Sequence, residues 1–241
     1  MKITRRQIAA AGGALALGAA AWWSQHDSPH YLNGDTTAFV RLFAAPPARD
    51  STQTRSELDE LLELQRVRTP AEVEAARADR KTQIERFFPA LGMDANAAAD
   101  LRATRALAQR VEDDVRLYVR AAKDRFRRLR PYEIEPRLKP CIDNVAGDLS
   151  YPSGHASYGY AMAYLLSEMV PERREALLRR ADEFARQRMV CGVHFRSDIE
   201  AGLTGVRWLA RAFNENTRYR REVQAAAAEL RAALRLPPLP Q

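Results

Sequence analysis

Two of the four histidines in this chain of 241 residues stand in settings that could support catalysis. His194 is followed four residues later by Asp198, which is one turn on if the segment is helical. That spacing lets the carboxylate accept the Nδ1 proton of the imidazole and leaves Nε2 free to attack an electrophile. A histidine near an aspartate is more often a structural hydrogen bond, so this pair needs independent support. The other two histidines, His26 and His30, lie near the N-terminus, where a metal-binding interpretation is weak.

His155 ends the run Tyr-Pro-Ser-Gly-His at residues 151–155. Proline and glycine in this run predict a turn that leads into the start of a helix. The hydroxyl of Ser153 and the free N–H groups that begin at Gly154 are the kind of donors that bind an anion at a helix N-terminus. His155 therefore stands beside a candidate anion site.

Three cations accompany these histidines. Six residues separate Lys123 from Arg130, and five separate Arg188 from His194. Arginine binds phosphate oxygens in a bidentate manner, and lysine serves as a point charge. Phosphoryl transfer needs positioning and charge stabilisation of the phosphate oxygens more than covalent chemistry, so three cations can take the place of a metal ion. We expect no metal site and no cofactor.

Together these residues resemble the three-block signature of the type 2 phosphatidic acid phosphatase superfamily. The blocks are Lys123-x6-Arg130-Pro131, Pro152-Ser153-Gly154-His155 and Arg188-x5-His194-x3-Asp198. Within the superfamily the chain is most similar to bacterial class A non-specific acid phosphatases, whose flanking sequences are echoed in Arg68-Thr69-Pro70, Lys139-Pro140-Cys141 and Cys191-Gly192-Val193-His194. The chain departs from the pattern at Gln187, where the family has serine before the arginine.

The resemblance implies an all-α, single-domain helical bundle of the acid phosphatase/vanadium haloperoxidase type. It implies that His194 is the nucleophile and forms a phosphohistidine, that Asp198 orients it, and that His155 is the general acid and base. It also implies that the phosphate is bound by Lys123, Arg130, Ser153, Gly154 and Arg188. Small phosphate monoesters are the expected substrates. Because His155 must hold a proton to act as an acid, we expect an acidic pH optimum.

Three alternatives share some of these features. Vanadium-dependent haloperoxidases carry the same blocks, because vanadate mimics phosphate at a cationic site. An integral lipid phosphatase would need repeated membrane-spanning segments, and after the N-terminal region no stretch reaches eighteen apolar residues. A non-catalytic anion-binding protein of the cell envelope is disfavoured, because all the catalytic positions are filled.

The first 25 residues are typical of an export signal. Paired arginines at Arg5 and Arg6 precede an apolar stretch over 8–21, as in a twin-arginine signal, although an uncleaved membrane anchor is the alternative. We therefore expect a periplasmic or secreted protein whose mature body does not bind membranes. In such an oxidising compartment the only two cysteines, Cys141 and Cys191, could form a disulfide.

The remaining chain divides into an extended arm over 26–50 and one helical domain over 51–241. Apolar spacing predicts one helix that ends near residue 68, a second from 70 to about 88, and a third that leads up to Lys123. Four more helices are predicted over 156–170, 171–190, 195–214 and 223–236. Residues 131–152 are expected to be a long functional loop. The acidic run Glu112-Asp113-Asp114 is expected to be a solvated helix face.

Composition agrees with a single helical domain, with 46% apolar and 29% charged residues. The net charge of +7 falls to +4 without Lys2, Arg5 and Arg6 (7 − 3). The remaining arginines alternate with acidic residues, which indicates solvated helix faces and not a nucleic-acid surface. A helical enzyme of this size could form a homodimer.

Overall fold

The computed structural model describes residues 28–94, 100–142 and 148–240, so the predicted export signal over 1–25 lies outside the described residues. Within these ranges the regular structure is helical, as predicted. The elements are α2 Thr37–Arg41, α3 Thr52–Val67, α4 Pro70–Ala78, the 3-10 turn η1 Ile84–Phe87, α5 Phe88–Leu91, α6 Arg102–Phe126, α7 Pro131–Ile134, α8 Gly154–Met169, η2 Pro171–Arg173, α9 Arg174–Val190, α10 Arg196–Glu215 and α11 Thr217–Ala233.

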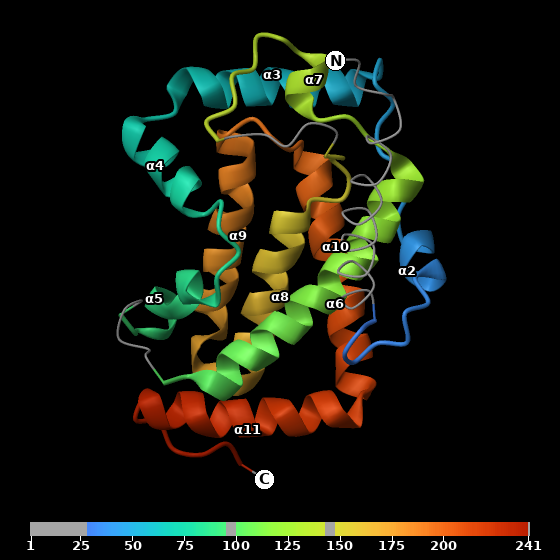
Figure 1. Ribbon diagram of the computed structural model, residues 1–241. Coiled ribbons are helices and arrows are strands. Elements are labelled where there is room, and N and C mark those ends of the chain that lie inside the picture. Colours follow the sequence, from blue (N-terminus) through green and yellow to red (C-terminus); the bar gives the residue numbers. More distant parts are fainter. Residues whose placement is uncertain (1–27, 95–99, 143–147, 241) are drawn as a thin grey trace, which may run out of the picture.

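Helix α8 is the centre of the bundle. It carries apolar or small residues on all its sides, and most of its side chains are buried, as expected for a helix covered all round. Helices α6, α9 and α10 surround it, and α11 crosses the end at which α8 finishes (Figure 1). The opposite end, where α8 begins at Gly154, is therefore held in place by three neighbouring helices.

Two glycines let the neighbouring helices approach α8 closely. A Cβ atom on Gly159 of α8 would lie 2.9 Å from the ring of Phe184 on α9. A Cβ atom on Gly202 of α10 would lie 3.1 Å from the carbonyl oxygen of Ser153, at the start of α8. Side chains at either position would push α9 or α10 away from the N-terminus of α8.

The segment that precedes α3 is largely irregular but contains the short helix α2. It is attached to α6 by Asp114, a fully buried carboxylate that accepts hydrogen bonds from the backbone N–H groups of residues 30, 31 and 32 at 2.6–3.2 Å. The prediction that Glu112, Asp113 and Asp114 form a solvated face is therefore wrong for Asp114, and also for Glu112, which is buried. His30 lies beside Asp113, with 3.3 Å between Nε2 and Oδ2.

Three element boundaries differ from the sequence prediction. The helix that starts at Pro70 ends at Ala78 instead of continuing to about residue 88, and η1 and α5 follow it. Helix α11 starts six residues before Val223, because the Asn216 side chain accepts a hydrogen bond from the N–H of Tyr219 and caps the helix. The loop predicted over 131–152 begins with one helical turn, α7.

Cys141 and Cys191 form a disulfide, as predicted. It joins the loop that follows α7 to the residue directly after α9, across a sequence separation of 50 residues. Among the described residues, no helix is long and apolar enough to cross a membrane.

Candidate active site

The turn between α9 and α10 presents His194. Gly192 has a φ of +67°, which ends α9 and reverses the chain, and the N–H of Val193 bonds back to the carbonyl of Arg188 at 3.0 Å. His194 therefore lies against the last turn of α9 and just before α10. It is 1% exposed.

Asp198, in the first turn of α10, holds one side of this imidazole. Its Oδ2 atom lies 3.2 Å from Nδ1 of His194 and accepts the N–H of Phe195 at 2.9 Å. Burial raises the pKa of Asp198, and the nearby Arg128 and hydrogen bonds from Ser150 and Phe195 oppose that rise. The predicted pair is thus in contact, with Nδ1 facing a carboxylate.

Two residues that the sequence analysis did not identify complete the surroundings of Asp198. Arg128 donates from Nη1 to Oδ1 of Asp198 at 2.7 Å, and the hydroxyl of Ser150 donates to Oδ2 at 2.5 Å. Arg128 also donates from Nη2 to Glu57 on α3 at 3.0 Å, and its guanidinium lies 3.9 Å above the ring of Phe195. The only sequence signal for Arg128 was its place between the two cations of the first block.

Arg130 contacts the other side of the imidazole. Its Nη1 atom lies 2.5 Å from Nε2 of His194 and donates to the carbonyl of Val193 at 2.7 Å. A guanidinium only donates, so Nε2 carries no proton and the Nδ1 nitrogen, which faces Asp198, does. The ligand-free site therefore holds His194 with the Nε2 lone pair available.

Arg188 is buried, at 4% exposed, yet its Nε and Nη1 atoms have no hydrogen-bond partner among the described residues. Burial and the neighbouring Arg130 lower the pKa of Arg188 to about 9. Unpaired guanidinium donors are rare in a protein interior, because leaving them unsatisfied costs free energy. They indicate a place for an anion. The adjacent Gln187, which departs from the family pattern, also has a buried, unpartnered Oε1 atom.

Lys123, near the end of α6, completes the cationic group. Its Nζ atom donates to the carbonyl of Leu149 and lies 3.6 Å from Oδ1 of Asp148. Burial and Arg130 lower the pKa of Lys123 to about 8. Burial, together with the charges of Arg130, Lys123 and Arg188, holds the pKa of His194 well below its usual range. All the predicted cations thus act on one imidazole.

Asp148 lies among these cations, and the sequence analysis did not identify it. Its Oδ2 atom pairs with Nη2 of Arg130, and its backbone carbonyl accepts from Nε of Arg130 at 3.2 Å. Its carboxylate is therefore placed where two of the three cations would contact a phosphate. An incoming anion must compete with it.

His155 is the second residue of α8 and is half-buried. Its Nε2 atom lies 2.8 Å from the backbone carbonyl oxygen of Arg80. Because a carbonyl only accepts, Nε2 carries a proton, and the nitrogen that titrates is Nδ1. Burial and the charge of Arg188 lower the pKa of His155 to about 3. With this lowered pKa His155 is neutral near neutral pH, and an anion bound beside it would raise the pKa again.

Ser153 and Gly154 begin α8. The Oγ atom of Ser153 accepts the N–H of Ala156 at 3.3 Å, so this fully buried side chain caps its own helix. Its hydroxyl proton remains free to donate to an anion. Sequence analysis assigned Ser153 to phosphate binding; its observed contact is the helix cap.

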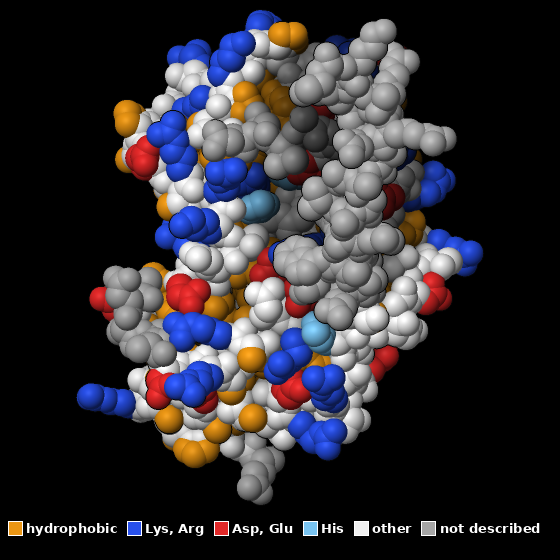
Figure 2. Space-filling view, viewed as in Figure 1, with side chains coloured by type: hydrophobic (Ala, Val, Ile, Leu, Met, Phe, Trp, Pro, Cys, Tyr) orange, Lys and Arg blue, Asp and Glu red, His pale blue; other side chains and the backbone are white. Residues whose placement is uncertain are grey.

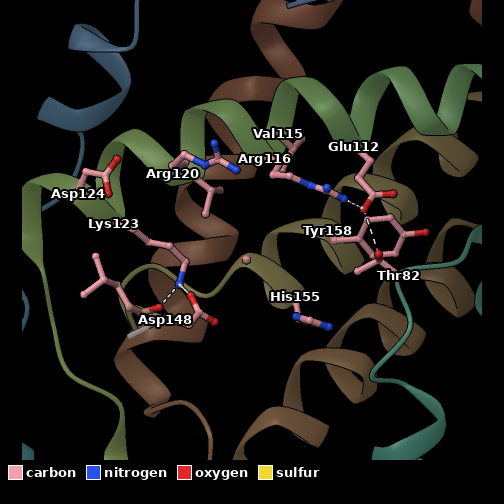
Figure 3. A pocket seen from close by; sticks show the side chains of 13 residues that line it. Thr82, Glu112, Val115, Arg116, Arg120, Lys123, Asp124, Asp148, His155 and Tyr158 are labelled. Atoms are coloured by element: carbon pink, nitrogen blue, oxygen red, sulfur yellow. Dashed lines mark hydrogen bonds and ion pairs between the residues drawn. The ribbon is translucent and has the colours of Figure 1, made fainter. Parts of the chain in front are cut away.

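A cavity of about 490 Å³ adjoins the phosphate-sized site. Lys123, Gly154 and His155 line the end nearest the cations, and Asp148 lies beside Lys123 (Figure 3). Its walls are formed mainly by the α6 side chains, by Tyr158 on α8 and by Thr82. On this face of the molecule, histidine side chains reach the surface with lysine and arginine side chains beside them (Figure 2). The cavity could hold the leaving group of a phosphate ester.

Comparison with known proteins gives matches that include this site. Residues 114–218 match the PAP2 superfamily. A non-specific acid phosphatase of Providencia stuartii is 32% identical over 126 residues, which are 51% of this chain and 51% of that protein. A non-specific acid phosphatase of Salmonella typhimurium is 41% identical over 85 residues, or 34% of each protein. An acid phosphatase of Zymomonas mobilis is 32% identical over 116 residues, 46% of this chain and 44% of that protein. The matched segments span about half or less of these relatives.

Two solved structures share the fold. A bacterial vanadium-dependent iodoperoxidase has a TM-score of 0.55 and 21% identity, covering 72% of this chain and 53% of that one. A transmembrane PAP2-type phosphatidylglycerolphosphate phosphatase from Bacillus subtilis has a TM-score of 0.50 and 19% identity, covering 75% of this chain and 92% of that one. These likenesses confirm the predicted type of helical bundle and concern the fold alone.

Proposed function

We propose that this chain, whose residues 114–218 match the PAP2 superfamily, is an acid phosphatase that hydrolyses small phosphate monoesters through a phosphohistidine. The observation that carries the proposal is Arg188, whose buried Nε and Nη1 donors have no partner in the part of the chain that the structure describes and whose charge acts on His194. An anion with several oxygens satisfies such donors. A phosphate monoester also provides an electrophilic phosphorus atom for the nearby imidazole.

In the first step, Nε2 of His194 attacks phosphorus in line with the leaving oxygen, forming the N–P bond as the P–O bond breaks. Arg130, Arg188 and Lys123 bind the phosphoryl oxygens, and His155 gives its proton to the leaving oxygen. Asp198 holds Nδ1 of His194 and stabilises the positive charge that develops on the ring. The alcohol then leaves through the cavity.

In the second step, neutral His155 takes a proton from a water molecule, whose oxygen attacks phosphorus and breaks the N–P bond. Inorganic phosphate and neutral His194 result, and His155 has regained its proton. No metal ion is required by this scheme. Removal of one preorganised donor in such a site typically lowers the rate about 10²- to 10³-fold.

The test is hydrolysis of p-nitrophenyl phosphate in the presence of EDTA by the wild type and by His194→Ala. We expect hydrolysis by the wild type and a loss of more than about 10³-fold in the variant. His30→Ala is the matched control, because His30 contacts Asp113 on the outer side of α6. Hydrolysis in EDTA that His194→Ala leaves unchanged would overturn the mechanism.

Two further arms separate the alternatives. Acid-labile labelled phosphate on the wild type, absent from His194→Ala, supports the phosphohistidine. Halide oxidation after addition of vanadate, without phosphate ester hydrolysis, would identify a haloperoxidase instead.

We also propose that the protein is exported to the periplasm or beyond. The twin-arginine-like start of the sequence and the Cys141–Cys191 disulfide both support an oxidising destination. Cell fractionation of the wild type and of the chain with Arg5→Lys and Arg6→Lys together tests this. Retention of the double variant in the cytoplasm is the expected result, and an unchanged distribution would contradict it.

A further inference from the structure

An ion-pair cluster around one buried carboxylate lies at the end of α4, outside the cavity. It consists of Asp79, Arg86 and Arg180, and we call it the Asp79 cluster. Asp79 is 2% exposed, and its Oδ1 atom accepts from Nη2 of Arg180 at 2.6 Å and from Nε of Arg86 at 2.9 Å. Arg180 also donates through Nε to the carbonyl of Arg86 at 3.0 Å. Charges are costly to bury even when they are paired, and the mechanism above does not use these.

The first link from this cluster to the active site is the peptide backbone. Asp79 is the residue that ends α4, and the carbonyl of the next residue, Arg80, is the group that accepts from Nε2 of His155. The N–H groups of Asp79 and Arg80 bond back to the carbonyls of Ala75 and Arg77. By pairing with Arg180 of α9, the side chain of Asp79 fixes the position of the turn that follows α4. That turn carries the Arg80 carbonyl, which accepts the hydrogen bond from His155.

The second link is a stack of rings along α9. The guanidinium of Arg180 lies 5.4 Å from the ring centroid of Phe184, one helical turn further on. The ring of Phe184 lies nearly parallel to that of His155, with centroids 6.3 Å apart and 19° between the planes. Gly159 permits this approach, as described above. The same arginine that pairs with Asp79 therefore also packs on the ring beside His155.

We infer that Asp79 is a positioning residue for the general acid, acting through the Arg80 carbonyl and through Arg180 and Phe184. By fixing both contacts it keeps the proton of neutral His155 on Nε2 and reserves Nδ1 for the proton that passes to the leaving oxygen. The inference rests on the proposed function for its catalytic meaning. The placement of the proton on Nε2 is independent of that function.

A direct test is the tautomer of His155, read from the ¹⁵N NMR signals of the imidazole nitrogens in the ligand-free chain near neutral pH. Loss of one set of signals in His155→Gln assigns them. We expect Nε2–H in the wild type and a mixture of both tautomers in Asp79→Asn and in Arg180→Lys. Arg180→Lys keeps the charge, so it serves if Asp79→Asn does not fold. The matched control is Glu222→Gln, which removes the 2.8 Å ion pair with Arg110 elsewhere in the bundle and should leave His155 unchanged.

The kinetic arm compares kcat/KM for p-nitrophenyl phosphate, whose leaving group needs little protonation, with that for glycerol phosphate, whose alkoxide needs a proton. Misplacing an acid by about 1 Å can lower a rate about 10²-fold. We therefore expect Asp79→Asn and Arg180→Lys to lose about 10- to 100-fold on glycerol phosphate and much less on p-nitrophenyl phosphate. A purely structural role, or an effect of Asp79 on the phosphate-binding cations, would lower both values equally.

The two arms separate the two proposals. If the wild type hydrolyses neither ester, the proposed function fails, while the NMR signals still test the position of the proton. The inference itself is overturned if His155 carries its proton on Nδ1 in the wild type, if both variants keep the wild-type tautomer, or if both esters lose activity by the same factor.

Discussion

The Nη1 atom of Arg130 lies 2.5 Å from the Nε2 atom of His194. In this arrangement the guanidinium points at the same lone pair that would attack phosphorus. His194, the proposed nucleophile, is therefore held in the tautomer that the proposed attack requires, with the opposite nitrogen 3.2 Å from Asp198. In the proposed mechanism a phosphate enters between the two side chains, and Arg130 exchanges its contact with the imidazole for contacts with phosphoryl oxygens.

We expect Arg188 to contribute to activity at a cost in the stability of the fold. We expect Arg188→Met to lower kcat/KM about 10²- to 10³-fold, because donors for the phosphoryl oxygens are lost. The melting temperature should stay the same or rise, because a buried guanidinium with two donors that no described residue satisfies is replaced by an apolar side chain.

Arg231→Met is the control for Arg188→Met. Arg231 is equally buried, but it pairs with Glu172 at 2.7 Å and donates to the carbonyls of Met169 and Pro237. Its replacement should lower the free energy of unfolding by about 1–3 kcal/mol and leave activity intact. A fall in stability for Arg188→Met as large as for Arg231→Met would contradict the assignment of Arg188 as an open anion site.

Asp148 should weaken anion binding. We expect Asp148→Asn to lower the inhibition constant of inorganic phosphate and the KM roughly three- to tenfold, because the competing charge next to Arg130 and Lys123 is removed. Inhibition kinetics at several phosphate concentrations measure both constants. Asp124→Asn is the control, since Asp124 also lines the cavity but forms no ion pair with these cations. Equal effects of the two substitutions would indicate a general change in the electrostatic potential of the cavity and would contradict a specific competition by Asp148.

The residues proposed to do the chemistry could be singled out from the sequence because their signals are local. His194 and Asp198 lie four residues apart, and Ser153 to His155 mark a helix start within a few residues. The helices around them follow from apolar spacing. Where the prediction of α4 failed, the cause is tertiary: Asp79 ends the helix where it pairs with Arg180, 101 residues further along the chain.

The supporting contacts were not predictable for the same reason. Arg128 reaches Glu57 across 71 residues and Asp198 across 70. Ser150 reaches Asp198 from a backbone segment without periodicity, 48 residues away. Asp148 enters the cationic site from the same segment. Each of these contacts joins different segments of the chain, and no spacing in the sequence records which segments meet.

Arg128 should be essential for stability. Arg128→Met leaves two buried carboxylates, on Asp198 and Glu57, without their common partner, and we expect a loss of about 3–5 kcal/mol in the free energy of unfolding by urea. Adding Glu57→Gln should recover part of that loss. Arg137→Met is the exposed control: Arg137 pairs with Glu135 at 2.8 Å on the surface, and its loss should leave the free energy of unfolding almost unchanged. A similar small loss for Arg128→Met would show that the network contributes little.

The depressed pKa values of the two site histidines predict how pH acts on the ligand-free protein. His155 titrates at about 3 when folded, against 6.5 when unfolded, and the pKa of His194 is also lowered. Between these values the unfolded chain binds more protons, so stability should fall as the pH drops from about 6.5 toward about 3. The sequence analysis expected His155 to be protonated. With the lowered pKa, protonation of His155 near neutral pH requires a bound anion that raises its pKa.

Sulfate tests that requirement, because it is a tetrahedral dianion that does not itself titrate near neutral pH. A dianion beside His155 raises the pKa of the imidazole, so binding should take up a proton and grow tighter as the pH falls from about 7 to about 5. Calorimetric titration in two buffers of different ionisation enthalpy measures the proton uptake, and the sulfate-induced rise in melting temperature measures the affinity. His155→Gln should bind sulfate without proton uptake and without this pH dependence. If proton uptake persists in His155→Gln, the titrating group is another residue, and His194 is the first candidate.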